Sequence, residues 1–218
     1  MPTAYDEVQC PSAVYSPTHP GRLASIALLS GMEPTPADRC RVWELGCGDG
    51  FNLLAMAGGL PESEFVGIDL AEQPIALGNA IATRIGQRNV RLIAKDVAED
   101  CSDLGQFDYI IAHGLFSWVP QHVRERVMKM CRTNLSPGGV AYISYNAYPG
   151  NHMRDLVRGM MRYHVAHFDN PTVQIQQARG LIKLLSEAGR RPTHTSKCLN
   201  VNWGAFGNIR TPVFSTTT

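Results

Sequence analysis

The fold of this chain is decided by one stretch, Val42-Trp43-Glu44-Leu45-Gly46-Cys47-Gly48-Asp49-Gly50. Its apolar beginning predicts a buried strand, and the glycines that follow predict a tight turn into a helix. A second apolar strand at 65–69 ends in the carboxylate of Asp69, at about the expected ~20 positions after the first glycine. This order is typical of an α/β sheet that binds a nucleotide-like ligand beyond the carboxyl ends of its strands.

The composition of the turn distinguishes between nucleotide-like ligands. A dinucleotide-binding turn, Gly-x-Gly-x-x-Gly, would need glycine at position 51, whereas this chain has Phe51 and its third glycine at Gly50. Glu44 and Asp49 would lie near the turn, and two carboxylates would repel a pyrophosphate. They would suit a ligand that carries an ammonium and a sulfonium group, as S-adenosyl-L-methionine does. A nicotinamide-dependent dehydrogenase is therefore disfavoured.

Length and composition limit the class of protein. The chain has 218 residues, 44% of them hydrophobic, and a formal net charge of +1. That length can form one full core, and the charge gives no basic footprint for nucleic acid. No apolar run approaches the ~18 residues of a membrane span, and the N-terminus lacks the apolar core of a signal peptide. The six cysteines form no Cys-x-x-Cys pair and no zinc-spaced cluster, so we expect a cytoplasmic protein without a metal site.

Strands alternate with helices along the first 150 residues. Apolar runs predict strands at 42–45, 65–69, 90–94, 107–112 and 140–145, and helical periodicity predicts helices at 22–32, 52–58, 73–85 and 123–135. The alternation predicts a Rossmann-like, doubly wound, mostly parallel sheet with helices on both faces. The strand ends would bring 44–50, Asp69, Asp96, His113 and 145–146 to one cleft.

The chain is expected to have three parts. Residues 1–39 would form an N-terminal arm and a helix over the cofactor cleft, 40–150 the cofactor-binding core, and 151–218 a helical extension with a polar tail. Only weak strand signals, at 199–203 and 213–214, could supply closing strands, so the sheet is expected to lack them. An unpaired sheet edge favours a homodimer with the region after Gly150 at its interface.

The glycine turn, the acid that ends strand two and the acid after strand three, in this order, resemble the class I S-adenosylmethionine-dependent methyltransferases. The resemblance covers about residues 40–146. It implies that the glycines bind the methionyl and ribose parts of the cofactor, that Asp69 binds the ribose diol, and that Asp96 and Val97 lie at the adenine. It places Glu44 near the ammonium group. The implied cofactor-binding residues are Glu44, Gly46, Cys47, Gly48, Gly50, Asp69, Leu70, Asp96, Val97 and His113, and the product would be S-adenosyl-L-homocysteine.

A narrower similarity covers more of the chain. It is carried by the segments 5–8 (Tyr-Asp-Glu-Val), 18–20 (Thr-His-Pro), 107–114, 117–120 (Ser-Trp-Val-Pro) and 142–150. These resemble bacterial methyltransferases with a C-terminal regulatory domain, a group that includes rickettsial protein lysine methyltransferases. The resemblance implies a protein lysine as a methyl acceptor. Those proteins are longer, so a shortened gene product is expected, either an enzyme or a non-catalytic cofactor-binding or interaction module.

Methyl transfer from a sulfonium requires little chemistry from the protein. It is an in-line displacement, so holding donor and acceptor in line is the main task, and a base is needed only for a protonated nucleophile. The catalytic residues therefore stay open. Candidates on the substrate side are His113, Trp118, Tyr145 and Tyr148, which follow strands four and five. For each the alternative is structural: a strand-capping histidine, a packed tryptophan and a solvated turn.

Overall fold

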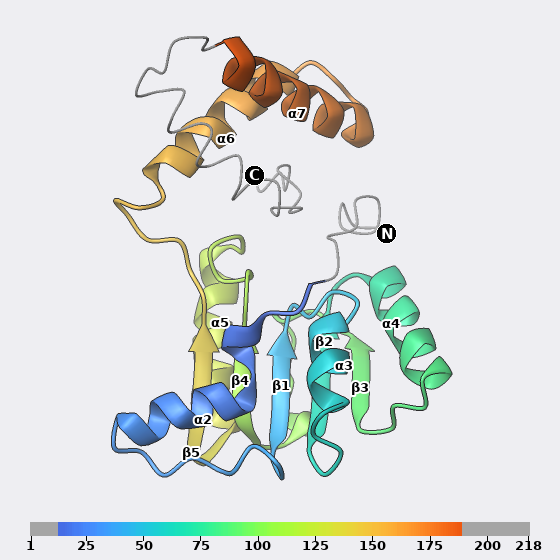
Figure 1. Cartoon of the computed structure of the whole chain (residues 1–218), viewed down its shortest axis with the longest axis vertical. Helices are drawn as coiled ribbons and strands as arrows, with labels where there is room; N and C mark the ends of the chain where they lie inside the picture. Colours follow the sequence, from blue (N-terminus) through green and yellow to red (C-terminus); the bar gives the residue numbers. More distant parts are fainter. Residues whose placement is uncertain (1–12, 189–218) are drawn as a thin grey trace. The chain divides into compact units, whose positions relative to one another are not determined.

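The computed structural model describes residues 13–188, which divide between two compact units (Figure 1). One unit spans Ser12–Tyr145, and the other takes in the described residues from Asn146 onward. The elements, in chain order, are η1 (Ser16–Thr18), α2 (Pro20–Leu29), β1 (Arg41–Leu45), α3 (Phe51–Ala57), β2 (Glu64–Asp69), α4 (Glu72–Arg84), β3 (Val90–Ala94), η2 (Ser102–Leu104), β4 (Phe107–Ala112), α5 (Gln121–Asn134), β5 (Leu135–Ile143), α6 (His152–Val165) and α7 (Pro171–Ala188).

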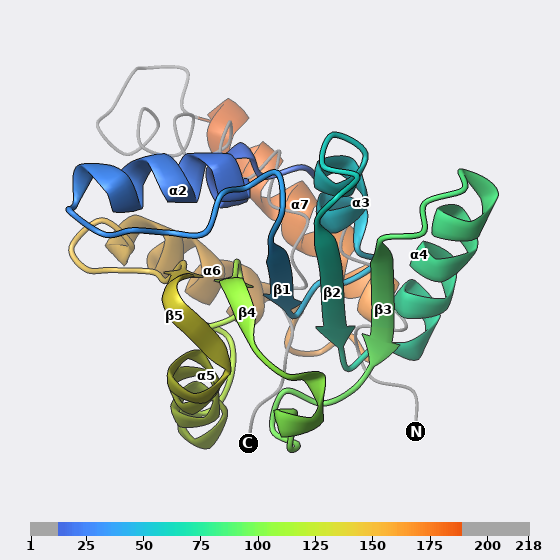
Figure 2. The same cartoon turned by 90° about the horizontal axis from the view of Figure 1, so that it is seen from below.

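The first unit contains a five-stranded parallel sheet in the order β3-β2-β1-β4-β5 (Figure 2). This confirms the predicted Rossmann-like fold. The strand order reverses between β1 and β4, and ligands in such sheets bind beyond the carboxyl ends at this reversal. Within residues 13–188 no strand extends the sheet beyond β5, and the weak strand segments at 199–203 and 213–214 lie outside these residues.

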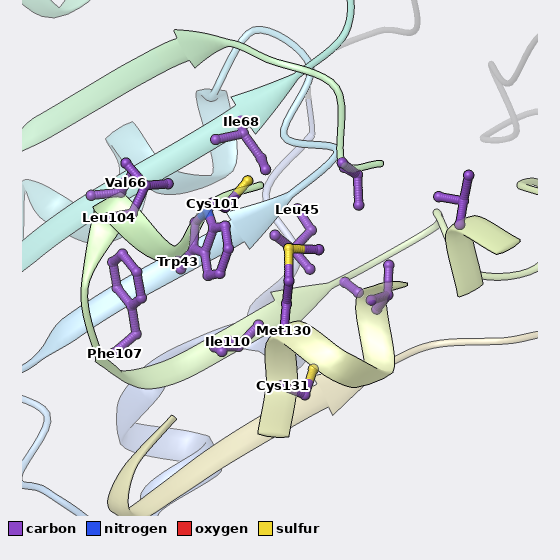
Figure 3. Packing of buried hydrophobic residues seen from close by; sticks show 14 residues of the cluster. Trp43, Leu45, Val66, Ile68, Cys101, Leu104, Phe107, Ile110, Met130 and Cys131 are labelled. Atoms are coloured by element: carbon purple, nitrogen blue, oxygen red, sulfur yellow. The ribbon is translucent and has the colours of Figure 1, made fainter. Parts of the chain in front are cut away.

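The strands β1, β2 and β4 are buried on both faces because they are almost continuously apolar. Successive residues of a strand point to opposite faces, so Val42 and Trp43 of β1 enter different core clusters. The Trp43 cluster is closed by α5, through residues such as Met130 (Figure 3). The Val42 cluster is closed by α2 and α3, which lie on the opposite face (Figure 2). Glu44, two positions after Val42, therefore shares the face covered by these two helices.

Strand β5 differs from its predicted bounds. The Pro-Gly-Gly sequence at 137–139 was expected to separate a helix from a strand that begins at Val140, but β5 begins at Leu135. Leu135 pairs with Phe107, while Val140 pairs with Tyr109, so the extra residues form an irregularity in the pairing. The hydroxyl of Ser136 donates a hydrogen bond of 2.7 Å to Asp108, which holds this irregular segment against β4.

The second unit contains two helices, α6 and α7, in the region where a helical extension was predicted. They pack on each other through a small buried cluster that includes Val157, Met161 and Ile182. Among residues 13–188, no three His, Cys, Asp or Glu side chains gather in an arrangement that could hold a metal ion. No helix in the same range is both long enough and apolar enough to cross a membrane.

Candidate cofactor-binding site

The glycine turn after β1 is held in a conformation that side chains disfavour. Gly46, Gly48 and Gly50 have φ values of 72°, 59° and 68°, all in the left-handed region. The turn is fastened to β2, because the backbone N–H groups of Gly46 and Cys47 both donate to the carbonyl of Ile68, at 2.8 and 3.0 Å. The three glycines are therefore required by the backbone itself.

The turn is also packed tightly from behind by Leu92 of β3. A Cβ atom at Gly50, at Gly67 of β2 or at Gly78 of α4 would lie 2.5 to 2.8 Å from this side chain. A Cβ atom at Gly78 would also lie 2.1 Å from the backbone carbonyl oxygen of Asp49. A Cβ atom at Gly48, in contrast, would meet no atom within 4 Å. The turn is thus crowded toward the core and open at its central glycine.

The carboxylate of Asp69, which ends β2, organises the turn. Its Oδ2 atom accepts a hydrogen bond of 2.8 Å from the backbone N–H of Gly48, and its Oδ1 atom accepts one of 2.9 Å from that of Ala71. Each carboxylate oxygen can accept more than one hydrogen bond. Asp69 therefore holds the turn and still has acceptor capacity for a diol.

Glu44 is a buried carboxyl group, only 4% exposed. Its Oε1 atom accepts a hydrogen bond of 3.0 Å from Nδ2 of Asn52, whereas its Oε2 atom is buried and has no hydrogen-bond partner among residues 13–188. The pKa of Glu44 is raised to about 7, mainly by burial. The Asn52 hydrogen bond opposes this shift, and the negative charges of Asp69 and Asp49 add to it. A half-satisfied buried acid of this kind is costly unless a ligand supplies positive charge.

Asn52 was not identified from the sequence, although it connects Glu44 to the N-terminal arm. Its Nδ2 atom also donates to the hydroxyl of Thr18 at 3.1 Å, and its Oδ1 atom accepts from the backbone N–H of Tyr15 at 3.0 Å. Asn52 and Thr18 are both buried. The sequence signal that could have found it is an amide side chain in the first turn of the helix after the glycines.

His113 follows β4 and lies against the arm. Its ring centroid is 4.0 Å from that of Tyr15 and 6.0 Å from that of Tyr142 in β5. Burial lowers the pKa of His113, and its buried Nδ1 atom finds no hydrogen-bond partner in the range 13–188. His19, in the same arm, caps α2, because its Nδ1 atom accepts a hydrogen bond of 3.1 Å from the backbone N–H of Gly21.

The predicted adenine-side residues follow β2 and β3. Asp96 accepts a hydrogen bond of 2.8 Å from the backbone N–H of Ala98, and Val97 is buried in the core. Leu70 is 48% exposed. The backbone N–H of Lys95 donates to the carbonyl of Asp69 at 2.9 Å, so the segments after the two strands lie side by side.

Burial raises the pKa of Cys47 well above its ordinary value, and nearby Glu44 raises it further, so this thiol is not a nucleophile.

The substrate-side candidates divide between the two units. Trp118 is partly buried after β4, and Tyr145, 67% exposed, is the last residue of the first unit. Tyr148 belongs to the second unit, where its hydroxyl donates to Asp155 and its ring lies 4.3 Å from that of His152. The hydrogen bond to Asp155 raises the pKa of Tyr148. Its place on the substrate side stays a prediction.

Comparison with known proteins identifies the family. The family model described as "Methyltransferase domain" matches residues 43–141. The uncharacterized protein RP028 of Rickettsia prowazekii is 35% identical over 185 residues, which are 85% of this chain and 74% of that protein. The solved structure of PKMT2 from Rickettsia typhi in complex with AdoHcy superposes with a TM-score of 0.81 at 31% identity. The chain belongs to the class I S-adenosylmethionine-dependent methyltransferases.

The cofactor of this methyltransferase family is S-adenosyl-L-methionine, as the glycine turn and its acids predicted. The methyltransferase described here covers only part of several relatives. The PKMT2 match covers 95% of this chain and 41% of PKMT2. The uncharacterized protein RP789 of R. prowazekii is 38% identical over 184 residues, which are 84% of this chain and 33% of that protein.

Proposed function

We propose that this chain binds S-adenosyl-L-methionine at the glycine turn and transfers its methyl group to an amine, with a protein lysine as the acceptor. The observation that carries the proposal is the buried Oε2 atom of Glu44, which has no partner in the described part of the chain and lies beside a turn that is open at Gly48. A cationic ligand with a slender amino-acid end matches both features. A dinucleotide matches neither, because its pyrophosphate would face the acids of this turn.

The chain's own residues would hold the cofactor in three places. The open backbone at Gly48 would lie against its amino-acid and ribose parts, and Asp69 would accept hydrogen bonds from the ribose hydroxyls. Asp96 and the buried Val97 would bind the adenine. When bound, the cofactor supplies an electrophilic methyl group on a positively charged sulfur.

The substrate side is proposed to lie after β4 and β5. His113 has a lowered pKa, so it is neutral at physiological pH and presents no charge that would repel an amine. Trp118, Tyr145 and Tyr148 are proposed to orient the acceptor. The lysine acceptor is supported by the resemblance to rickettsial lysine methyltransferases and by the similarity to PKMT2.

Calorimetry and a turnover assay test this function together. The chain should bind S-adenosyl-L-homocysteine in the micromolar range and should not respond to NADH. Incubation with S-adenosyl-L-methionine and a panel of proteins, small amines and acids should then release S-adenosyl-L-homocysteine. Binding without turnover on any acceptor would instead favour a non-catalytic cofactor-binding module. Tight NADH binding without a response to S-adenosyl-L-homocysteine would contradict the proposal.

A homodimer is part of the proposal, with the region after Gly150 at its interface. The support is the edge of β5, which no other strand covers within residues 13–188. Light scattering on the intact chain should give twice the monomer mass, and a version that ends near position 189 should keep it. A monomer in both samples would contradict this assembly.

A cytoplasmic location also stays a proposal, supported by the free thiols of Cys40, Cys47, Cys101 and Cys131.

A further inference from the structure

Asn52 joins three parts of the first unit that are far apart in the sequence. It lies in the first turn of α3 and is 4% exposed. It contacts Glu44 of β1, eight positions away, and the arm residues Thr18 and Tyr15, which are 34 and 37 positions away. An amide with both of its sides engaged in a buried network has one rotamer and one orientation.

The hydrogen-bond partners fix which end of the Asn52 amide faces which neighbour. The backbone N–H of Tyr15 can only donate, so it requires the Oδ1 atom of Asn52 as its acceptor. The NH₂ group must then face the Glu44 carboxylate and the Thr18 hydroxyl. The hydroxyl of Thr18 donates in turn to the carbonyl of Tyr15 at 2.8 Å, so this hydroxyl both accepts and donates a hydrogen bond.

One carboxylate oxygen of Glu44 receives no hydrogen bond from this network. Asn52 satisfies Oε1 and thereby sets the plane of the carboxyl group, while Oε2 is buried and no residue from 13 to 188 pairs with it. The other charged groups that act on Glu44, Asp69 and Asp49, are negative. Within residues 13–188, therefore, no positive charge acts on Glu44, and an isolated carboxylate without Asn52 would be free to rotate away from a bound cation.

The arm is bound by the same amide. The Tyr15 ring lies 4.0 Å from that of His113, so the arm extends from α3 to the end of β4. Figure 1 shows this blue segment crossing the carboxyl ends of the central strands. Any change at Asn52 would loosen the arm and the carboxyl group together.

We propose that Asn52 is a positioning residue, which orients the Glu44 carboxylate toward the ammonium group of the cofactor and ties the N-terminal arm to it. The inference rests on the proposed function, because it assigns the amino-acid end of S-adenosyl-L-methionine to Glu44. It predicts that Asn52 controls affinity for the amino-acid end of the ligand and not for its nucleoside end.

Two ligands separate these ends. S-adenosyl-L-homocysteine carries the ammonium group, and 5′-methylthioadenosine has the same adenosine and sulfur without it. Calorimetry on the full chain with Asn52→Leu should show affinity for S-adenosyl-L-homocysteine reduced at least tenfold, and affinity for 5′-methylthioadenosine changed less than threefold. Wild-type binding of S-adenosyl-L-homocysteine, measured first, tests the proposed function separately.

Asn134→Leu is the matched control. Asn134 is 5% exposed and its Nδ2 atom donates to backbone carbonyls at Gly105 and Cys101, away from the glycine turn. It should lower the melting temperature, as Asn52→Leu does, but leave the ratio of the two affinities as in the wild type. An equal loss of both affinities in Asn52→Leu, or an unchanged ratio, would overturn the proposal.

Glu44→Gln keeps the test decisive if Asn52→Leu does not fold. It retains an acceptor for Asn52 and removes the charge, so it should reproduce the selective loss of S-adenosyl-L-homocysteine affinity. If both variants fold, the double variant should lose little more than either one, because the two residues act as a unit. A wild-type affinity ratio in Glu44→Gln, or additive losses in the double variant, would overturn the proposal.

Discussion

The carboxylate of Asp69 accepts a hydrogen bond of 2.8 Å from the backbone N–H of Gly48. The acid that the resemblance assigns to the ribose is thus also a structural part of the glycine turn that it faces. Its second oxygen holds the start of the next loop through Ala71. The ligand side and the structural side of this carboxylate cannot be altered independently.

Asp69→Ala should therefore reduce both binding and stability. Charge-assisted hydrogen bonds to the ribose contribute roughly 1.5–3 kcal/mol each, so S-adenosyl-L-homocysteine should bind at least tenfold more weakly. The loss of an acceptor for two backbone N–H groups should cost about 1–3 kcal/mol of unfolding free energy. Calorimetry and urea unfolding measure the two effects. The control is Asp103→Ala, which removes an exposed ion pair with Lys95 and should change neither. Unchanged binding in Asp69→Ala would show that the acid is only a strand-end residue.

Gly78→Ala should damage the turn from behind. The new methyl group would meet the Asp49 carbonyl oxygen at 2.1 Å, so the helix or the turn must move, at a cost of about 1–3 kcal/mol. Gly180→Ala is the matched helical control, because a Cβ atom there meets nothing within 4 Å. It should be neutral or stabilising by up to about 1 kcal/mol. Equal melting temperatures for the two variants would contradict the packing described here.

The stability of the chain should depend on the ionisation of Glu44. Its pKa of about 7 in the folded chain lies above its ordinary value of 4.5, so protonation favours folding. The contribution is full below about pH 4.5 and is lost as the pH rises through 7, by up to about 3 kcal/mol. Urea unfolding of wild type and Glu44→Gln from pH 4.5 to 8 isolates it, because His113, whose lowered pKa acts in the opposite direction, is present in both. A difference between the two proteins that is constant with pH would show that Glu44 titrates normally.

The parts of the fold that were predictable from the sequence depend on local signals. The strands β2, β3 and β4 are short apolar runs with clear ends, and β3 and β4 have the predicted bounds. The predicted start of β5 was wrong because its Pro-Gly-Gly segment resembles a turn, whereas the pairing of Leu135 with Phe107 of β4 makes it part of the strand. A contact of this kind between distant residues cannot be predicted from the local sequence.

The candidate site likewise contains residues that the sequence predicted and residues that it did not. The turn glycines and Asp69 follow from a spacing pattern, and the structure brings them together. Asn52 could not be recognised, because its hydrogen-bond partners Thr18 and Tyr15 lie more than 30 positions earlier in the chain. An asparagine in a first helical turn is otherwise an ordinary residue. Which unit Tyr148 belongs to was equally invisible in the sequence.

Tyr145→Phe should affect turnover more than cofactor binding. Tyr145 is exposed at the end of the first unit and forms no part of the turn, so its hydroxyl is expected to act on the acceptor. With an acceptor from the turnover panel, kcat should fall about tenfold or more, while affinity for S-adenosyl-L-homocysteine should stay within about twofold. Tyr163→Phe, an exposed tyrosine of α6, serves as the control. Equal losses in kcat and in affinity would make Tyr145 a cofactor or packing residue.

The packing of Leu92 against Gly50, Gly67 and Gly78 has a consequence for how the site recognises its ligand. Because Leu92 packs against the turn from behind, the turn is held in one conformation. Little conformational entropy is then lost at the turn on binding, which favours tight binding of a small ligand. The same rigidity limits the range of ligands to which the turn can adapt by mutation. A ligand that required a wider turn would need coordinated changes on β2, β3 and α4, so the chain is more readily adapted to new acceptors than to a new cofactor.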